Sequence, residues 1–137
     1  MKYVVISPGS RSAPLVIAFN RQEGIECLSI VDERSAAFFA LGMAQQLQAP
    51  VGLLCTSGSA VLNYAPAIAE AFYQKIPLIV FTADRPWEAI DQGENQSIVQ
   101  FDIYKNYIKK GFELPVDCHH EKDLMYNDRL VNEAFNV

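Results

Sequence analysis

Four short apolar runs, separated by longer segments with helical spacing, constrain the fold of this chain more than any other feature. The runs lie at residues 3–6, 25–31, 51–55 and 78–82, and each has the length of a buried strand. The segments between them, at residues 12–22, 33–48 and 59–74, carry helical patterns. This alternation is typical of βαβ units. We therefore predict an α/β fold, with a doubly wound, mainly parallel sheet and helices on both faces.

The length of 137 residues matches one domain, so we predict a single domain over residues 1–137. Ser12 is positioned to cap the first helix, and Pro66 is expected to kink the third. After a loop that follows the fourth run, we expect a strand at residues 110–114 and an amphipathic segment at residues 123–135.

The two ends of the chain are unusual for a complete doubly wound protein. The sequence begins directly in its first strand and stops in a helix-like stretch without a stop signal. We therefore expect a piece of a longer enzyme, in which residues 116–137 begin a linker or form a terminal helix.

Composition excludes several classes of partner. Sixteen acidic residues against eleven basic ones give a net charge of −5, and no Lys/Arg cluster is present, so nucleic acid and anionic membrane surfaces are poor partners. The three cysteines form no CxxC pair, and the only two histidines are adjacent, which argues against a disulfide framework or a metal site. No signal peptide and no run of 18 apolar residues is found, so we expect a cytoplasmic protein.

The second predicted helix is apolar on all sides. No charged residue occurs between Ser35 and Ala69, and the stretch 36–44 reads AAFFALGMA. A helix on a sheet needs only one apolar face, so its second side must also be covered. Two explanations remain open: cover by another chain or a missing domain, or burial inside this same domain.

Polar clusters follow all four predicted strands, at residues 7–12, 32–34, 56–59 and 84–86. Ligands of parallel α/β sheets bind beyond the carboxyl ends of the strands, so we expect these clusters to share one rim. The first cluster, SPGSRS, places Gly9, serine hydroxyls and Arg11 at a helix N-terminus, which suits a carboxylate or a phosphate. The alternative is an ordinary strand-to-helix turn.

Two further features allow both a functional and an ordinary interpretation. The TSGS cluster is not a GxSxG elbow, which argues against a serine hydrolase and leaves helix capping as its ordinary interpretation. Glu33 begins the most apolar helix, where the helix dipole favours a carboxylate and desolvation opposes its charge, so a basic group could exchange a proton with it. Its ordinary interpretation is a first-turn glutamate.

The series VISPGSRSAPL, VDERSAAFFALGMA, CTSGSAVLN, TADRP and GENQSI resembles the N-terminal pyrimidine-binding domain of thiamine diphosphate enzymes. The likeness covers residues 3–115. Within that family it is most similar to the menaquinone-biosynthesis branch, in which 2-oxoglutarate loses carbon dioxide and its succinyl unit adds to isochorismate. This resemblance implies a transferase with thiamine diphosphate and Mg²⁺ or Mn²⁺ as cofactors, acting as a homodimer or homotetramer.

The resemblance also implies roles for individual residues. Glu33 matches the glutamate that hydrogen-bonds N1′ of the aminopyrimidine and promotes its reactive tautomer, so it is expected to be both catalytic and cofactor-binding. The turn of Thr56, Ser57 and Gly58 is expected near the pyrimidine ring. The expected substrate-binding residues are Ser10, Arg11, Arg85, Asn95 and Gln96. Paired arginines suit two substrates that both carry carboxylates.

The chain departs from the family in one respect that bears on function. The family binds the diphosphate and its metal with a separate domain that carries a GDG…N motif, and this motif is absent here. No metal ligand is therefore expected in this chain, and the chain alone is expected to be inactive. The alternatives are a domain of another thiamine diphosphate decarboxylase or carboligase, and a non-catalytic anion-binding or dimerisation module.

Overall fold

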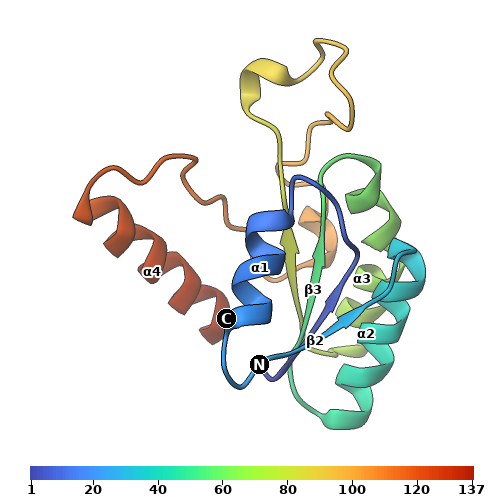
Figure 1. Cartoon of the computed structure of the whole chain (residues 1–137). Coiled ribbons are helices and arrows are strands. Elements are labelled where there is room, and N and C mark those ends of the chain that lie inside the picture. Colours follow the sequence, from blue (N-terminus) through green and yellow to red (C-terminus); the bar gives the residue numbers. More distant parts are fainter.

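The structure, a computed structural model, describes all of residues 1–137 and is built on one four-stranded sheet. Its strands are β1 (Tyr3–Ile6), β2 (Glu26–Ser29), β3 (Val51–Cys55) and β4 (Leu78–Thr82), in the order β2-β1-β3-β4 (Figure 1). All three neighbouring pairs are parallel, so the predicted α/β fold with a parallel sheet is confirmed. The strand predicted at residues 25–31 is shorter than expected, because β2 pairs only with the four residues of β1.

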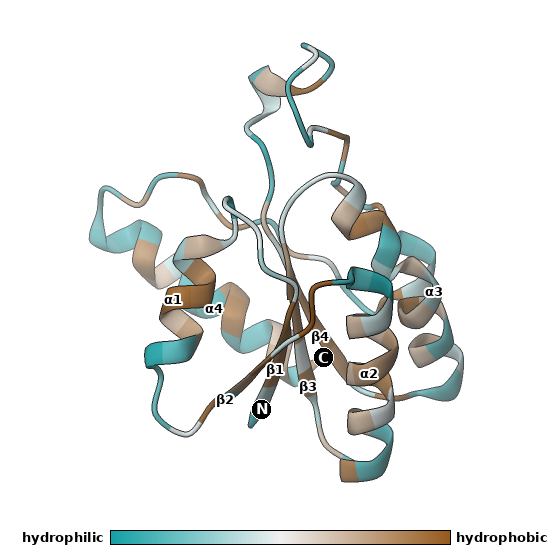
Figure 2. Cartoon of the chain, turned by 45° about the vertical axis from the view of Figure 1, so that its right-hand side comes forward, coloured by the Kyte–Doolittle hydropathy of each residue, from teal (hydrophilic) through white to brown (hydrophobic).

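Helices cover both faces of the sheet. Helix α1 (Ala13–Arg21) lies on one face, whereas α2 (Glu33–Leu47) and α3 (Ser59–Gln74) lie on the other (Figure 1). Successive side chains of a strand point to opposite faces, so Val4 packs with the α1 side and Val5 with the α2 and α3 side. Figure 2 shows that the strands between these two helical layers consist largely of hydrophobic residues, which are coloured brown.

The apolar helix α2 is covered on two sides within the domain. It packs on the sheet and beside α3, and its small residues Ala36, Ala37, Ala40 and Ala44 are fully buried. A third side is left open, because Phe38 and Phe39 remain 42% and 49% exposed. Burial inside the domain therefore explains the alanines but leaves these two rings uncovered.

The prediction that Ser12 caps α1 with its side chain is wrong. The Ser12 hydroxyl instead donates to the carbonyl of Gly9 at 3.1 Å, inside the preceding turn. The helix start has Pro14 in its first turn, where the missing N–H removes no helical hydrogen bond. In α3, Pro66 does not end the helix, which continues from Ser59 to Gln74.

The predicted strand at residues 110–114 is also wrong, since these residues have no regular structure. They lie between the short 3₁₀ helix η2 (Lys105–Tyr107) and helix α4 (Glu121–Asn136). Lys110 pairs with Glu133 of α4, so this segment contacts a helix near the end of the chain. Figure 1 shows α4 apart from α2 and α3. No helix of the structure has the length and apolar character needed to cross a membrane.

Candidate functional site

The order of the strands places the ends of β1 and β3 side by side, and the chain changes direction between them. The chain leaves β1 toward α1 on one face and leaves β3 toward α3 on the other, and ligands of α/β sheets bind at such a reversal. The two turns meet there, because the Arg11 guanidinium donates to the Ser57 hydroxyl at 3.3 Å. The structure thus brings together two predicted site residues that are 46 positions apart.

Glu33 stands at the first position of α2, immediately after the end of β2. The helix is capped by Asp32, whose carboxylate accepts from the Ser35 N–H at 2.7 Å, and hydrogen bonds from Ser35 lower the pKa of Asp32. Glu33 itself is partly buried. Its charge helps to raise the pKa of Cys55 and Tyr64, which places the carboxylate within electrostatic reach of the end of β3.

A buried layer of weak acids lies at the end of β3. Tyr64 donates to the Leu54 carbonyl at 2.8 Å and lies 3.4 Å from the Ser7 hydroxyl, which in turn donates to the Ile30 carbonyl at 3.0 Å. Burial raises the pKa of Cys55 to about 12 and also raises the pKa of Tyr64. Both side chains are therefore neutral at physiological pH, so Glu33 is the only charged group among these residues near the end of β3.

The turn after β3 contributes three different polar groups. Thr56 is buried and its hydroxyl has no hydrogen-bond partner, so it is free to bond a ligand. The hydroxyl of Ser57 accepts from Arg11 and donates to the Gln96 carbonyl at 2.9 Å. Gly58 has a φ of +78°, and a Cβ there would lie 2.9 Å from the backbone of Gln96. The capping interpretation of TSGS is wrong, because no side chain of this turn caps α3.

The segment after β4 folds back onto the same rim. Arg85 forms an ion pair with Glu94 at 2.9 Å and donates to the Asn95 carbonyl at 3.0 Å. Its guanidinium therefore already has an acidic partner. Asn95 and Gln96 are exposed. The hydrogen bonds that they accept from Arg85 and Ser57 use their backbone carbonyls, so these bonds do not involve their side chains. Ser10 is exposed on the turn after β1.

One residue of the rim is not predicted by any motif in the sequence. Gln100 is buried, accepts from the Gly58 N–H at 2.7 Å and donates to the Ala83 carbonyl at 2.9 Å. It thus joins the turns that follow β3 and β4. Its neighbours Val99 and Phe101 form no motif with it, so only the tertiary contact identifies it.

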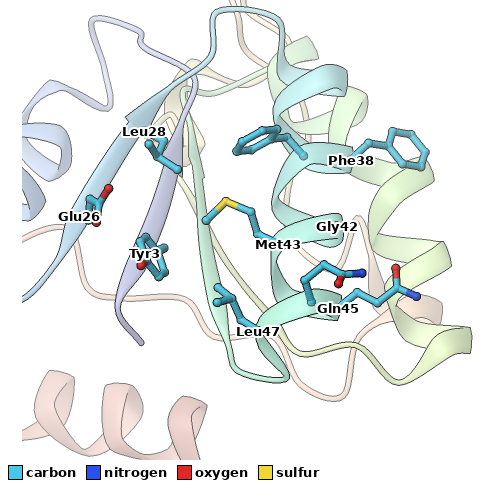
Figure 3. A pocket seen from close by; sticks show the side chains of 10 residues that line it. Tyr3, Glu26, Leu28, Phe38, Gly42, Met43, Gln45 and Leu47 are labelled. Carbon is cyan, nitrogen blue, oxygen red and sulfur yellow. The ribbon is translucent and has the colours of Figure 1, made fainter.

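An open hollow of the structure lies away from this rim. It has a volume of about 730 Å³ and is an open groove between the β1–β2 edge and α2 (Figure 3). Tyr3, Leu28, Met43 and Leu47 line it, together with Phe38 and Phe39, and none of the predicted site residues does. No three His, Cys, Asp or Glu side chains lie close enough together to hold a metal ion.

The comparisons with known proteins agree with this architecture. The family described as "Thiamine pyrophosphate enzyme, N-terminal TPP binding domain" matches residues 1–104. The curated relatives include proteins named 2-succinyl-5-enolpyruvyl-6-hydroxy-3-cyclohexene-1-carboxylate synthase. The protein from Desulfotalea psychrophila is 54% identical over 100% of this chain and 26% of its own length. The one from Christiangramia forsetii is 61% identical over 79% of this chain and 19% of its own length.

A third relative of the same name, from Porphyromonas gingivalis, is 48% identical over 99% of the chain and 24% of its own length. The chain thus spans about a quarter of the length of these curated relatives or less. The family match extends over most of the chain and includes the turns after all four strands. The chain therefore belongs to the thiamine pyrophosphate enzyme family, as an N-terminal TPP binding domain.

Proposed function

We propose that this chain is the pyrimidine-binding half-site of a synthase that decarboxylates 2-oxoglutarate and adds the succinyl unit to isochorismate in menaquinone biosynthesis. The observation that supports the proposal is that the charge of Glu33 acts on Cys55 and Tyr64 at the end of β3, the strand that leads into the turn where Arg11 bonds Ser57. The printed name of the relatives supports the choice of reaction. We assign the reaction to the cytoplasm.

The rim fits the polar heteroaromatic half of thiamine diphosphate. The buried Thr56 hydroxyl lacks a partner, so it can bond a ring nitrogen or amino group without breaking an existing contact. Ser57 and Gly58 complete the same turn and would lie beside the ring. When bound, thiamine diphosphate supplies a nucleophilic carbon and an electron sink for the loss of carbon dioxide. We assign its diphosphate and the Mg²⁺ or Mn²⁺ to another part of the enzyme.

Glu33 would hold and return a proton at N1′ of the aminopyrimidine. The uncharged Cys55 and Tyr64 offer the carboxylate no cationic partner, which leaves it free for a ring nitrogen. A positioned acid–base group of this kind contributes about 10² to 10⁴ in rate.

Arg11 and Arg85 would bind the substrate carboxylates from two sides of the rim. Arg11 makes one hydrogen bond, to Ser57, and therefore keeps donors for a substrate. Arg85 is paired with Glu94, so a substrate carboxylate would have to share or replace that partner. Ser10, Asn95 and Gln96 have exposed side chains around these arginines and would add hydrogen bonds.

We also propose that the enzyme is a homodimer or homotetramer. Phe38 and Phe39 of α2, which are among the residues that line the groove of Figure 3, leave large apolar area in contact with water. Exposed apolar area costs about 25 cal/mol per Å², which favours its burial against another copy.

Substitution of Glu33 by Gln in the full-length enzyme tests the proposed function. Hydrogen–deuterium exchange at the thiazolium C2 of the bound cofactor is expected to slow by about 10² or more, because the amide cannot exchange a proton with the ring. Glu23→Gln, on the exposed turn between α1 and β2, is the control and should leave exchange unchanged. Exchange at the parental rate in Glu33→Gln would overturn the proposal.

A further inference from the structure

Gln100 is the only buried Asn or Gln of this chain, and both ends of its side-chain amide are used. Its oxygen accepts from the Gly58 N–H at 2.7 Å, and its nitrogen donates to the Ala83 carbonyl at 2.9 Å. These partners fix the orientation of the amide, because an N–H needs an acceptor and a carbonyl needs a donor. The side chain therefore spans the gap between the ends of β3 and β4.

The two backbone groups that Gln100 satisfies are themselves buried. Gly58 is the N-cap of α3, whose first N–H groups have no partner inside the helix. Ala83 follows β4 directly and is 8% exposed. Loss of the amide would leave both groups without a partner in a region that water does not reach. The bond to Gln100 is therefore a strong constraint on where residue 100 can lie.

This constraint acts on the segment that carries the predicted substrate residues. Four positions before Gln100, the Gln96 carbonyl accepts from Ser57, and the Gln96 backbone lies so close to Gly58 that no Cβ would fit there. At the other side of the segment, Arg85 holds the Asn95 carbonyl. The segment is thus tied at residues 94, 95, 96, 97 and 100, and among these Gln100 is the only residue that is itself buried.

We propose that Gln100 is a positioning residue, whose amide holds the 94–100 segment against the turn after β3 and so sets where Asn95, Gln96 and Arg85 meet the substrate carboxylates. The inference rests on the proposed function for the identity of the substrates. It assigns Gln100 no contact with substrate or cofactor. It predicts that Gln100 affects recognition of the carboxylates and leaves the proton exchange at Glu33 intact.

Gln100→Met in the full-length enzyme removes both hydrogen bonds at similar side-chain volume. The Michaelis constants for 2-oxoglutarate and isochorismate should each rise about tenfold or more, as expected for one or two lost bonds. Exchange at the thiazolium C2 should stay within about twofold of the parent. The matched control is Gln92→Met, just before this segment, because Gln92 is exposed and makes one long bond of 3.4 Å to its near neighbour Ile90.

Gln100→Glu supplies a second test, whose expected pH dependence would not arise if Gln100 only filled space. An ionised carboxylate keeps the bond from Gly58 but turns an oxygen toward the Ala83 carbonyl, where the parent has a donor. Protonation restores that donor. The ratio of the Michaelis constant of Gln100→Glu to that of the parent should therefore fall toward one as pH is lowered from about 8 to about 6. Gln100→Met should show no such recovery.

A readout that needs no substrate completes the experiment. Hydrogen exchange at the Gly58 amide, measured by mass spectrometry on the full-length enzyme, should become about tenfold faster in Gln100→Met and stay parental in Gln92→Met. Faster exchange with unchanged Michaelis constants would overturn the inference, and so would parental exchange at Gly58. If Glu33→Gln also leaves C2 exchange at the parental rate, the proposed function fails on separate grounds.

Discussion

A Cβ on Gly9 would lie 2.4 Å from the Cβ of Thr56, so the turn after β1 and the turn after β3 touch without room for a methyl group. The two residues are far apart in the sequence, and the same two turns are joined by the hydrogen bond from Arg11 to Ser57. A real Cβ essentially never approaches another atom so closely. The small size of Gly9 is therefore a condition for bringing the two turns together.

Gly9→Ala is accordingly expected to destabilise the chain by about 1–3 kcal/mol, because the added methyl must displace Thr56 or the turn itself. Gly42→Ala is the control. Gly42 lies inside α2 with open space around its Cβ position, so alanine there should stabilise the chain by about 0.5–1 kcal/mol. Urea unfolding of the three proteins, followed by circular dichroism, measures both effects. Equal stability of Gly9→Ala and the parent would refute the steric argument.

Most of the fold is predictable from local sequence pattern. Three strands and the three helices that follow the strands lie where apolar runs and helical spacing place them, because each element buries a face whose period is visible in its own residues. The wrong predictions concern residues whose structure is not determined by such a local pattern. Residues 110–114 resemble a strand in composition, but the Lys110–Glu133 pair ties them to a helix near the end of the chain.

The sequence predicts which edge of the sheet carries the candidate site, but it does not predict the hydrogen bonds and ion pairs between the site residues. The polar clusters follow the strands, and parallel strands bring their carboxyl ends to one edge, so the contact between the turns that carry Arg11 and Ser57 follows from the fold. The partners of individual side chains do not follow from the fold. The ion pair of Arg85 with Glu94 and the two bonds of Gln100 depend on how the segment after β4 folds back, which residue type and spacing do not reveal.

Cys55 should make the folded chain less stable in alkali. Burial raises its pKa from the usual value of 9.0 to about 12, so above pH 9 the unfolded chain loses a proton that the folded chain keeps. Its contribution to stability is therefore complete below pH 9 and is lost as pH rises from about 9 toward 12. One such group lowers the free energy of unfolding by up to about 1.4 kcal/mol per pH unit.

The measurement is urea unfolding at several values between pH 8 and pH 10, compared with Cys55→Ala. The variant should be less stable at every pH because it leaves a cavity, but its stability should decline less steeply above pH 9. Cys118→Ala is the control and should keep the parental slope, because Cys118 is exposed. Parental slopes in both variants would contradict the assignment of the alkaline loss to Cys55.

Arg11→Ala and Arg85→Ala should weaken substrate use more than cofactor binding in the full-length enzyme. A guanidinium that binds a carboxylate contributes about 1.5–3 kcal/mol, so kcat/KM for each affected substrate should fall by about tenfold to 150-fold. Arg11→Ala is expected to have the larger effect, because Arg85 already shares its charge with Glu94. Steady-state kinetics and a thiamine diphosphate titration measure the two properties separately.

Arg21→Ala is the control for these variants, since Arg21 ends α1 at the opposite end of the sheet from the rim. It should leave kcat/KM unchanged for both substrates. The assignment of Arg11 and Arg85 to the substrate carboxylates would be wrong if kcat/KM stayed at the parental value in both variants, or if the affinity for the cofactor fell as far as kcat/KM.

The open side of α2 is expected to hold two copies of the chain together. Phe38 and Phe39 stay 42% and 49% exposed on a helix with no charged residue after Arg34, so a charge placed there should oppose association. Phe39→Glu should shift the chain to a monomer in sedimentation velocity at concentrations where the parent associates. Val116→Glu is the control, because Val116 is 86% exposed in a segment without regular structure and should leave association unchanged. A parent that sediments only as a monomer at high concentration would show that this face of α2 does not hold two copies of the chain together.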